Sequence, residues 1–206
     1  LAVECFTRQT HARRELIVVD DGGIDYTPIF APYVERGDRI VYERRRHDPR
    51  LRLGGLRNRA IELASGEWCI QWDDDEWYHP TRIARQLDAA SGADAAALRW
   101  TLMCVQSPRH GRLVYRADAG IATPGTLLHR PDLARYPNLA RGEDSVFLRD
   151  VRRAGGLAVL GRDDAHLFVR VFHGANTWDE RHFLARLRRR AVDWPSYAGK
   201  KRQLPW

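Results

Sequence analysis

The stretch WCIQWDDD, residues 68–75, ends a short apolar run with three consecutive aspartates, Asp73, Asp74 and Asp75. Its first five residues, 68–72, predict a buried strand whose end opens onto a loop. Carboxylates packed at the end of such a strand repel one another unless a metal ion, arginines or backbone amides compensate their charge. The stretch therefore indicates a sheet edge that holds a divalent cation, and the alternative is a solvated acidic turn.

Apolar, β-branched runs alternate with helical patterns along the chain, which is typical of an α/β fold. Strands are expected at 15–20, 39–43, 68–72, around 97–105, 112–115, 157–160 and 167–172. Helices are expected up to about His11, from Thr27 and Pro28, over 56–64, from His79 and Pro80, over 143–154 and over 178–194. With 206 residues and 44% hydrophobic content, one domain around one core is the simplest arrangement.

The formal charge of +7 comes almost wholly from arginines, because Lys200 and Lys201 are the only lysines. These arginines are scattered among acids, which disfavours a nucleic-acid-binding arm and predicts no nucleic-acid partner. Cys5, Cys69 and Cys104 are too few for a disulfide framework or a tetrahedral zinc set, so a reducing, cytoplasmic location is expected. No apolar run approaches the roughly 18 residues of a membrane span, and no signal peptide is visible, although the chain begins with leucine.

Two acidic groups follow expected strands at the same kind of position. Asp20 and Asp21 end the first expected strand, and Asp73 and Asp75 end the third. Because ligands of open α/β sheets bind at the carboxyl ends of the strands, both groups are candidates for one binding site. The alternative for Asp20 and Asp21 is a turn whose backbone amides they satisfy.

Arg57 and Asn58 lie between these acidic groups in the sequence, near the start of an expected helix. A cation and an amide at this position could meet a nucleotide base or phosphate. The alternative for Arg57 is an ordinary surface arginine.

Five stretches, taken in order, resemble glycosyltransferase family 2 and together cover nearly the whole chain. They are VVDDGGID at 18–25, GGLRNRAIELASGEW at 54–68, CIQWDDDEWYHP at 69–80, RGEDSVFLRD at 141–150 and VRVFHGANTW at 169–178. The resemblance implies one GT-A domain over 1–206, with a Rossmann-like, mixed and mostly parallel sheet flanked by helices. Residues 1–105 would form the nucleotide-sugar-binding half, and residues 106–206 the acceptor-binding half.

The resemblance also implies roles for the donor-binding residues. Asp20 and Asp21 match the acidic pair that contacts the base and ribose of a sugar nucleotide, and carboxylates can accept hydrogen bonds from both. Arg57 matches the arginine beside the base and diphosphate, and Asn58 is its neighbour.

Asp73 and Asp75 match the two acids of the family's DxD motif. The second acid ligates Mn²⁺ or Mg²⁺, and the first approaches the ribose or the metal. The cation bridges both phosphates and neutralises the charge that develops on the leaving diphosphate. His173 resembles a histidine that lies at the diphosphate or completes the metal shell, and the alternative is a core or turn histidine.

Glu143 and Asp144 match the family's ED pair, in which one carboxylate removes the proton of the attacking hydroxyl, and Asp144 is the favoured base. The alternative is an acid pair that stabilises a helix start through the macrodipole. The implied reaction is direct, inverting, in-line transfer of a sugar from a nucleoside diphosphate, with UDP favoured, to the hydroxyl of a glycan or lipid-linked acceptor.

The family normally begins with a central strand upstream of the first helix, and this sequence apparently lacks it. Either upstream residues are left out of the sequence or another segment fills the slot, because an unfilled slot exposes two rows of unpaired backbone groups.

The segment HFLARLRRRAVDW, residues 182–194, places Phe183, Leu187 and Trp194 on one helical stripe with arginines around it. Such a helix could make peripheral contact with the inner face of an anionic membrane. The alternative is a helix packed on its own domain.

Other classes of function stay open at this stage. A sugar-phosphate nucleotidyltransferase would share the architecture, but the glycine-rich phosphate loop that its chemistry needs is not seen. A noncatalytic sugar-nucleotide or RNA-binding protein on the same fold is the non-enzyme alternative, and RNA binding would depend steeply on salt and little on metal.

Overall fold

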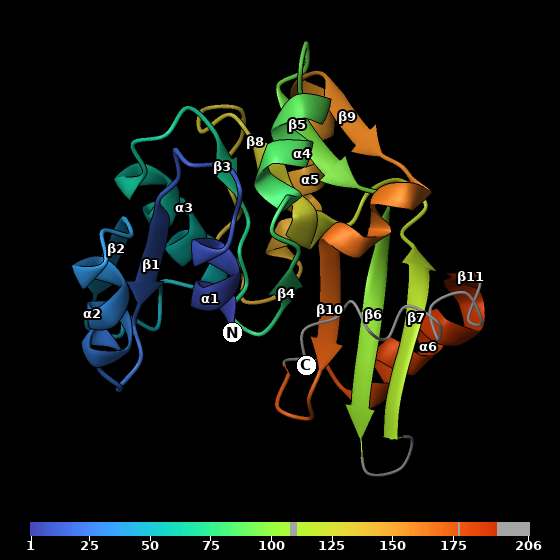
Figure 1. Cartoon of the computed structure of the whole chain (residues 1–206), viewed down its shortest axis with the longest axis horizontal. Coiled ribbons are helices and arrows are strands. Elements are labelled where there is room, and N and C mark those ends of the chain that lie inside the picture. The colour runs from blue at the N-terminus through green and yellow to red at the C-terminus, as the bar shows by residue number, and fades with distance from the viewer. Residues whose placement is uncertain (108–110, 177, 193–206) are drawn as a thin grey trace.

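The computed structural model describes residues 1–107, 111–176 and 178–192. The helices are α1 (Ala2–Thr7), α2 (Thr27–Glu35), α3 (Leu53–Leu63), α4 (Arg82–Ala89), α5 (Glu143–Ala154) and α6 (Glu180–Arg190), with the short turns η1 (Pro124–Thr126) and η2 (Arg162–Leu167). The strands are β1 (Leu16–Asp20), β2 (Ile40–Arg44), β3 (Cys69–Ile70), β4 (Trp77–Tyr78), β5 (Ala95–Leu98), β6 (Trp100–Ser107), β7 (Gly111–Asp118), β8 (Leu128–His129), β9 (Leu157–Leu160), β10 (Phe168–Phe172) and β11 (Ala191–Val192). Within this part of the chain the strands form three sheets flanked by helices, which confirms the mixed α/β arrangement (Figure 1).

β1 and β2 form a parallel pair at one side of the molecule (Figure 1). The pairing runs from Leu16 opposite Ile40 to Asp20 opposite Arg44, so both strands end at the same edge. α3 packs on β1 and α2 packs on β2. The polar residues that follow the two strands therefore gather at one open edge, as expected for ligand-binding loops.

β1 and β3 each have one strand neighbour in the described part of the chain, β2 and β8 respectively. No described strand joins these two sheets. The strand expected over 68–72 is limited to Cys69–Ile70, because its ladder consists of only two residues of β8.

β8 lies between β3 and β5 and runs antiparallel to both, while β5 and β9 are parallel. The alanines of β5 are fully buried, and Ala95 and Ala97 pack in a core cluster with residues of α5. In the same cluster the ring of Tyr136 stacks on Phe147 of α5, with centroids 3.8 Å apart and planes at 13°. This stack fixes the chain segment before α5 against the helix.

The third sheet has the order β11-β7-β6-β10-β4. β4 runs antiparallel to β10, with Tyr78 opposite Phe168 and Trp77 opposite Val169. Continuing this register brings the residues just before β4, which include Asp75, toward the end of β10, after which His173 follows. Two motifs far apart in the sequence thus meet because of one strand pairing.

The expectation of a mostly parallel sheet is wrong. Parallel pairing is limited to β1–β2, β5–β9 and β6–β10, and the other pairs among the described residues are antiparallel. The connection between β6 and β7 is too short for a parallel crossover, so these strands must reverse direction. The apolar region around 97–105 contains two strands, β5 and β6, rather than one.

The division at residue 105 falls inside β6, which pairs with both β7 and β10. The two halves are therefore joined through a continuous strand, and their assignment to donor and acceptor stays a prediction.

α6 begins later and ends earlier than the helix expected over 178–194. Phe183 is 1% exposed and packs on Phe172 of β10, with ring centroids 5.1 Å apart, so this part of the helix packs on its own domain. Trp194 and the side chain of Leu187 lie outside the described residues, and membrane contact of the helix stays a prediction. Among the described residues, no helix combines the length and apolar character that a membrane span requires.

Candidate functional site

Asp75 and His173 lie together at the end of β10. His173 Nε2 is 3.6 Å from Asp75 Oδ2, and Asn176 donates its side-chain amide to the same oxygen at 2.9 Å. Asn176 also donates to the Val171 carbonyl at 2.9 Å and accepts from the His173 backbone N–H at 2.8 Å. Asn176 thus fixes the turn that carries His173 to Asp75.

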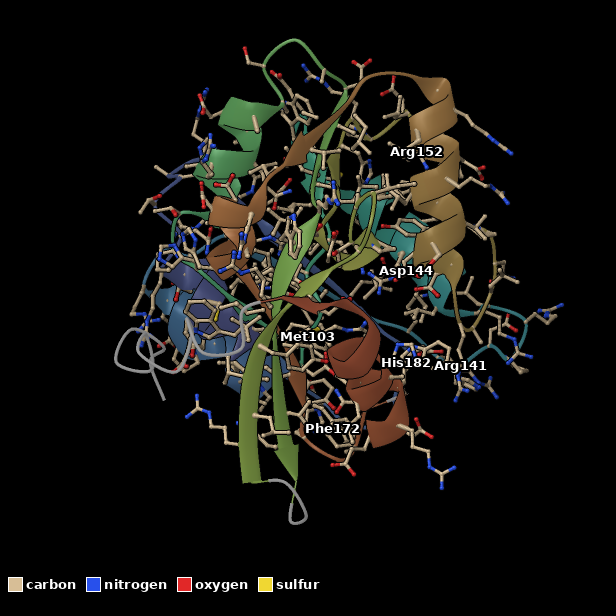
Figure 2. The ribbon with its side chains drawn as sticks, turned by 90° about the vertical axis from the view of Figure 1, so that its right-hand side faces the viewer. Met103, Arg141, Asp144, Arg152, Phe172 and His182 are labelled. Atoms are coloured by element: carbon tan, nitrogen blue, oxygen red, sulfur yellow. The ribbon has the colours of Figure 1, made fainter. Side chains whose placement is uncertain are left out.

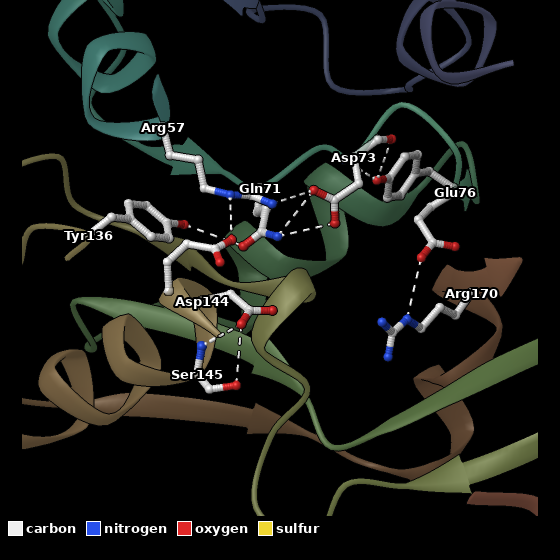
Figure 3. Close-up of polar contacts among 10 residues, drawn as sticks. Arg57, Gln71, Asp73, Glu76, Tyr136, Asp144, Ser145 and Arg170 are labelled. Carbon is white, nitrogen blue, oxygen red and sulfur yellow. Dashed lines mark hydrogen bonds and ion pairs between the residues drawn. The ribbon is translucent and has the colours of Figure 1, made fainter. Parts of the chain in front are cut away.

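The carboxylate of Asp73 is held by the protein itself (Figure 3). Arg57 donates to Oδ1 at 2.8 Å, and Gln71 Nε2 lies 3.3 Å from Oδ1 and 3.1 Å from Oδ2. The backbone is also fixed, because the Asp73 N–H donates to the Tyr78 hydroxyl, which donates to the Asp73 carbonyl at 2.9 Å. Asp73 is therefore a fixed acceptor, whereas none of the described arginines pairs with Asp75.

Arg57 spans the space between Asp73 and Glu143. Its Nη2 is 2.8 Å from Asp73 Oδ1 and its Nε is 3.1 Å from Glu143 Oε1. Burial alone would lower the pKa of the Arg57 guanidinium, but the charges of Asp73 and Glu143 raise it well above its ordinary value. Arg57 stays charged and links the aspartate triplet to the start of α5.

Glu143 and Asp144 occupy the first turn of α5, which follows Gly142 in the left-handed conformation at φ 75°. Glu143 is 3% exposed, and this burial raises the pKa of its carboxyl although Arg57 opposes the shift. Asp144 is half-buried and accepts from the backbone N–H of Ser145 at 2.6 Å and from its hydroxyl at 3.3 Å. The buried Glu143 therefore forms an ion pair with Arg57, and Asp144 is the more accessible carboxylate of the two.

Asp20 and Asp21 lie at the open edge of the β1–β2 sheet. Asp20 accepts from the Gly22 N–H at 2.8 Å and from the Tyr42 hydroxyl at 2.9 Å. Asp21 Oδ2 lies 2.9 Å from His47 Nδ1. The edge has a cavity of about 500 Å³, which is lined by Asp21, Gly22, Gly23, Arg44, Arg45, Arg46 and His47. Both aspartates thus lie at the strand end at which the sequence analysis expects a ligand, and Asp20 also satisfies a backbone amide of the turn, as the alternative holds.

Asn58 has a structural contact that sequence analysis did not predict. Its amide donates to the Tyr136 carbonyl at 2.8 Å, and its carbonyl oxygen accepts from the Tyr136 N–H at 2.9 Å. Both polar atoms of the side chain are used in this way. Asn58 supports the chain before α5, and donor binding by Asn58 stays a prediction.

The residues proposed for a cation fit it only in part. Within residues 1–107, 111–176 and 178–192, no three His, Cys, Asp or Glu side chains gather closely enough to hold a metal ion. Asp75 and His173 offer one oxygen and one nitrogen, while Asp73 is held by Arg57 and Gln71. Burial raises the pKa of the Asp75 carboxyl, and the charges of Asp74 and Asp73 raise it further. A cation there would relieve this repulsion and would need further oxygens, such as those of a substrate's phosphates.

Glu76, directly after the triplet, is a buried residue with a structural role that sequence analysis did not identify. It accepts from the Val171 N–H and its Oε1 lies 3.5 Å from Arg170 Nε. Burial raises the pKa of the Glu76 carboxyl well above its ordinary value, although Arg170 opposes the shift. The contacts anchor the aspartate loop to β10.

An exposed aromatic side chain, Trp178, lies near the N-terminal end of α5. Trp178 is 40% exposed and stacks on His182, with ring centroids 4.7 Å apart and planes at 19°. The guanidinium of Arg141 lies 5.7 Å from the Trp178 ring centre. Figure 2 shows Arg141 and His182 close to the end of α5 that carries Asp144. A surface with an aromatic ring and an arginine therefore adjoins the accessible carboxylate.

Comparison with known proteins identifies the family. Residues 2–145 match the family model described as glycosyl transferase family 2. The chain belongs to this family. A relative is EpsH of Bacillus subtilis (strain 168), named as a glycosyltransferase, which is 33% identical over 89 residues. That match covers 43% of this chain and 25% of EpsH, so the chain corresponds to a part of that relative.

Solved structures confirm the GT-A fold of this family 2 chain. S. aureus TarS 1-349 in complex with UDP-GlcNAc has a TM-score of 0.65 and 17% identity, over 90% of this chain and 59% of the TarS 1-349 chain. The mannosyltransferase PcManGT from Pyrobaculum calidifontis, in complex with GDP-Man and Mn²⁺, has a TM-score of 0.58 and 19% identity, over 90% of this chain and 55% of PcManGT. At these identities the likeness concerns the fold.

Proposed function

We propose that this chain is a metal-dependent, inverting glycosyltransferase that moves a hexosyl or N-acetylhexosaminyl group from a UDP-sugar to an acceptor hydroxyl. The observation that carries the proposal is the position of Arg57, which bonds to Asp73 at 2.8 Å and to Glu143 at 3.1 Å. One side chain thus joins the segment proposed to bind the donor to the segment proposed to activate the acceptor. Such an arrangement holds two reactants in a fixed relation, which is the main source of rate enhancement in direct transfer.

The donor is proposed to lie along the carboxyl ends of β1 and β3. Asp20 and Asp21 would contact the base and ribose at the edge of the 500 Å³ cavity, and Asp73 would accept from a ribose hydroxyl. UDP is favoured because the TarS structure, which contains UDP-GlcNAc, is similar in fold, but the GDP-Man of PcManGT makes guanosine the second candidate.

A bound Mn²⁺ or Mg²⁺ would neutralise charge on the diphosphate as it leaves, and Asp75 and His173 are the residues proposed to hold it. The Mn²⁺ in the PcManGT complex supports the use of a divalent cation. Asn176 would keep both residues in place through its contacts with the Asp75 carboxylate and the His173 backbone N–H.

Asp144 is proposed to be the general base. It would take the proton of the acceptor hydroxyl while the oxygen attacks the anomeric carbon, and the bond from that carbon to the diphosphate oxygen would break with its electron pair on the leaving group. Its hydrogen bonds from Ser145 hold the carboxylate at the start of α5. Direct displacement of this kind inverts the anomeric carbon.

The acceptor is proposed to be a glycan or a lipid-linked sugar. The exposed ring of Trp178 beside Arg141 supports this class, because an indole can pack on the apolar face of a sugar ring while a guanidinium donates hydrogen bonds. A cytoplasmic location, with contact to the inner membrane face through the C-terminal basic helix, is the corresponding proposal for its place in the cell.

Thermal unfolding with UDP, GDP and dTDP, each with and without Mn²⁺, tests the proposal. A nucleotide that binds the folded protein raises the unfolding temperature more as its concentration exceeds its dissociation constant. At equal concentrations the favoured base is therefore the one with the largest shift, and Mn²⁺ should increase that shift. Release of UDP from a UDP-sugar in the presence of glycan acceptors then tests transfer. The absence of any nucleotide-dependent shift would contradict the donor site, and a shift that is independent of Mn²⁺ would contradict the cation site.

A further inference from the structure

Gln71 lies between the aspartate triplet and the segment before α5 (Figure 3). The residue is 7% exposed, and its side-chain nitrogen donates toward both oxygens of Asp73, at 3.3 and 3.1 Å. Its side-chain oxygen accepts from the Tyr136 hydroxyl at 3.3 Å. The two contacts fix the orientation of the amide, because a reversed amide would place two acceptors together at Asp73.

Tyr136 is itself held rigidly. Its ring stacks on Phe147 with centroids 3.8 Å apart, and its backbone N–H and carbonyl both bond to Asn58. These contacts hold the hydroxyl beside the Gln71 side-chain oxygen. The Tyr136 hydroxyl and the Gln71 amide form a relay from α5 to Asp73.

Gly125 lies beside this relay. A Cβ added at Gly125 would lie 3.4 Å from Asp73 Oδ2 and 3.6 Å from Gln71 Nε2, which is ordinary contact distance. A side chain at position 125 would therefore contact the Asp73 carboxylate and the Gln71 amide, whereas glycine leaves them accessible. Without the Gln71 amide, Oδ2 of Asp73 loses its donor, and the carboxylate is held by Arg57 at Oδ1 alone.

We propose that Gln71 and Tyr136 are positioning residues that set the Asp73 carboxylate for the donor and couple it to α5. The inference rests on the proposed function, because it assumes that Asp73 contacts the donor. Two routes then join the triplet to α5: one through Arg57 and Glu143, and one through Gln71, Tyr136 and Phe147. The first route is ionic and the second is neutral.

Three variants test the relay: Gln71→Met, which keeps the length of the side chain, Tyr136→Phe, which keeps the ring stack, and the double variant. Dissociation constants for UDP with Mn²⁺, kcat and KM, and unfolding temperatures are measured for each. We expect Gln71→Met to weaken UDP binding about tenfold, equivalent to about 1.4 kcal/mol, and Tyr136→Phe to weaken it about threefold. The double variant should be no weaker than Gln71→Met, because both changes act through one contact.

Tyr115→Phe is the matched control. The Tyr115 hydroxyl is also buried and donates to the Phe183 carbonyl at 2.7 Å, so its removal has a similar effect on packing outside the donor region. It should lower the unfolding temperature at least as much as Tyr136→Phe and leave UDP affinity at the wild-type value. If Gln71→Met destabilises the fold strongly, UDP binding by Tyr136→Phe still tests the relay, because this variant removes only the hydroxyl oxygen and keeps the ring.

The outcomes separate the two proposals. If the wild-type protein binds UDP with Mn²⁺ and both single variants bind it equally well, the relay is refuted and the proposed function stands. Additive losses in the double variant also refute the relay, because they indicate independent effects. If the wild-type protein binds none of the nucleotides, the proposed function fails and this inference fails with it.

Discussion

Asn176 donates its side-chain amide to Asp75 Oδ2 at 2.9 Å, although 101 residues separate the two in the sequence. The contact depends on the antiparallel pairing of β4 with β10, which brings the aspartate triplet to the end of β10. Asn176 also bonds to the His173 backbone, so one amide orders both residues proposed to hold a cation.

Replacing Asn176 by alanine is therefore expected to weaken the response to Mn²⁺. Loss of the two contacts leaves Asp75 and His173 free to move apart, and we expect the Mn²⁺ concentration for half-maximal activity to rise about tenfold, in the range found when metal-supporting residues are removed. A titration of activity and of UDP-dependent thermal shift against Mn²⁺ measures the effect. Asn138→Ala is the control, because Asn138 bonds in a similar way to the backbone of Arg50 and Arg52. An equal change in both variants would contradict the special role of Asn176.

Asp73→Asn and Asp75→Asn should differ in their effects on stability. Asp73 compensates the partly buried charge of Arg57, so we expect Asp73→Asn to cost roughly 2 kcal/mol, less than for a fully buried pair because both side chains are partly exposed. Asp75→Asn removes a carboxylate that is repelled by Asp73 and Asp74, so stability should stay equal or rise, while the Mn²⁺ response disappears. Urea unfolding and Mn²⁺ titration check the two effects. A stable Asp73→Asn protein would contradict the role of the ion pair.

Much of this site could be predicted from strand ends. Asp20, Asp21 and the aspartate triplet follow apolar strands, and the carboxyl ends of strands in an α/β sheet lie where ligands bind. The fold class was equally accessible, because β-branched runs and helical patterns alternate. The parallel character was overestimated, since short antiparallel strands such as β3, β4 and β8 leave only two residues each as a signal.

The residues that escaped prediction act over long sequence separations. Gln71 looked like part of a buried strand, and its partner Tyr136 is 65 residues away. Arg82 gave no signal either, because arginine normally lies at the surface, yet it is fully buried with its guanidinium 4.6 Å from the Tyr78 ring centre. Such contacts are set by tertiary packing. A single sequence does not reveal which distant residues come together, so it carries no pattern that predicts them.

Asp144→Asn and Glu143→Gln should separate chemistry from structure. Asp144→Asn removes the proposed base but keeps an acceptor for the Ser145 N–H, so kcat should fall roughly 10²- to 10⁴-fold with UDP affinity unchanged. Glu143→Gln weakens the contact to Arg57, so it should lower the unfolding temperature and affect UDP binding as well. Steady-state kinetics with calorimetric UDP binding distinguishes the two patterns. Full activity of Asp144→Asn would show that another group accepts the proton.

Glu76 should make folding stability decrease as pH rises. Because its folded-state pKa is raised above the ordinary value of 4.5, the folded protein binds a proton more tightly than the unfolded chain does. The stability contribution is present in full below pH 4.5 and is lost as pH rises through the raised value. Glu76→Gln cannot titrate, so the free energy of unfolding of the wild type relative to this variant should fall by up to about 1.4 kcal/mol per pH unit in that window.

Urea unfolding of both proteins between pH 5 and 8 gives this difference directly, and the contributions of all other groups cancel. Glu67→Gln serves as the control for the removal of a carboxylate, because the Glu67 side chain is 86% exposed. If the wild type and Glu76→Gln show parallel curves, Glu76 is ionised in the folded state at the same pH as in the unfolded chain. In that case its contacts with Val171 and Arg170 would fully offset the desolvation that its burial imposes.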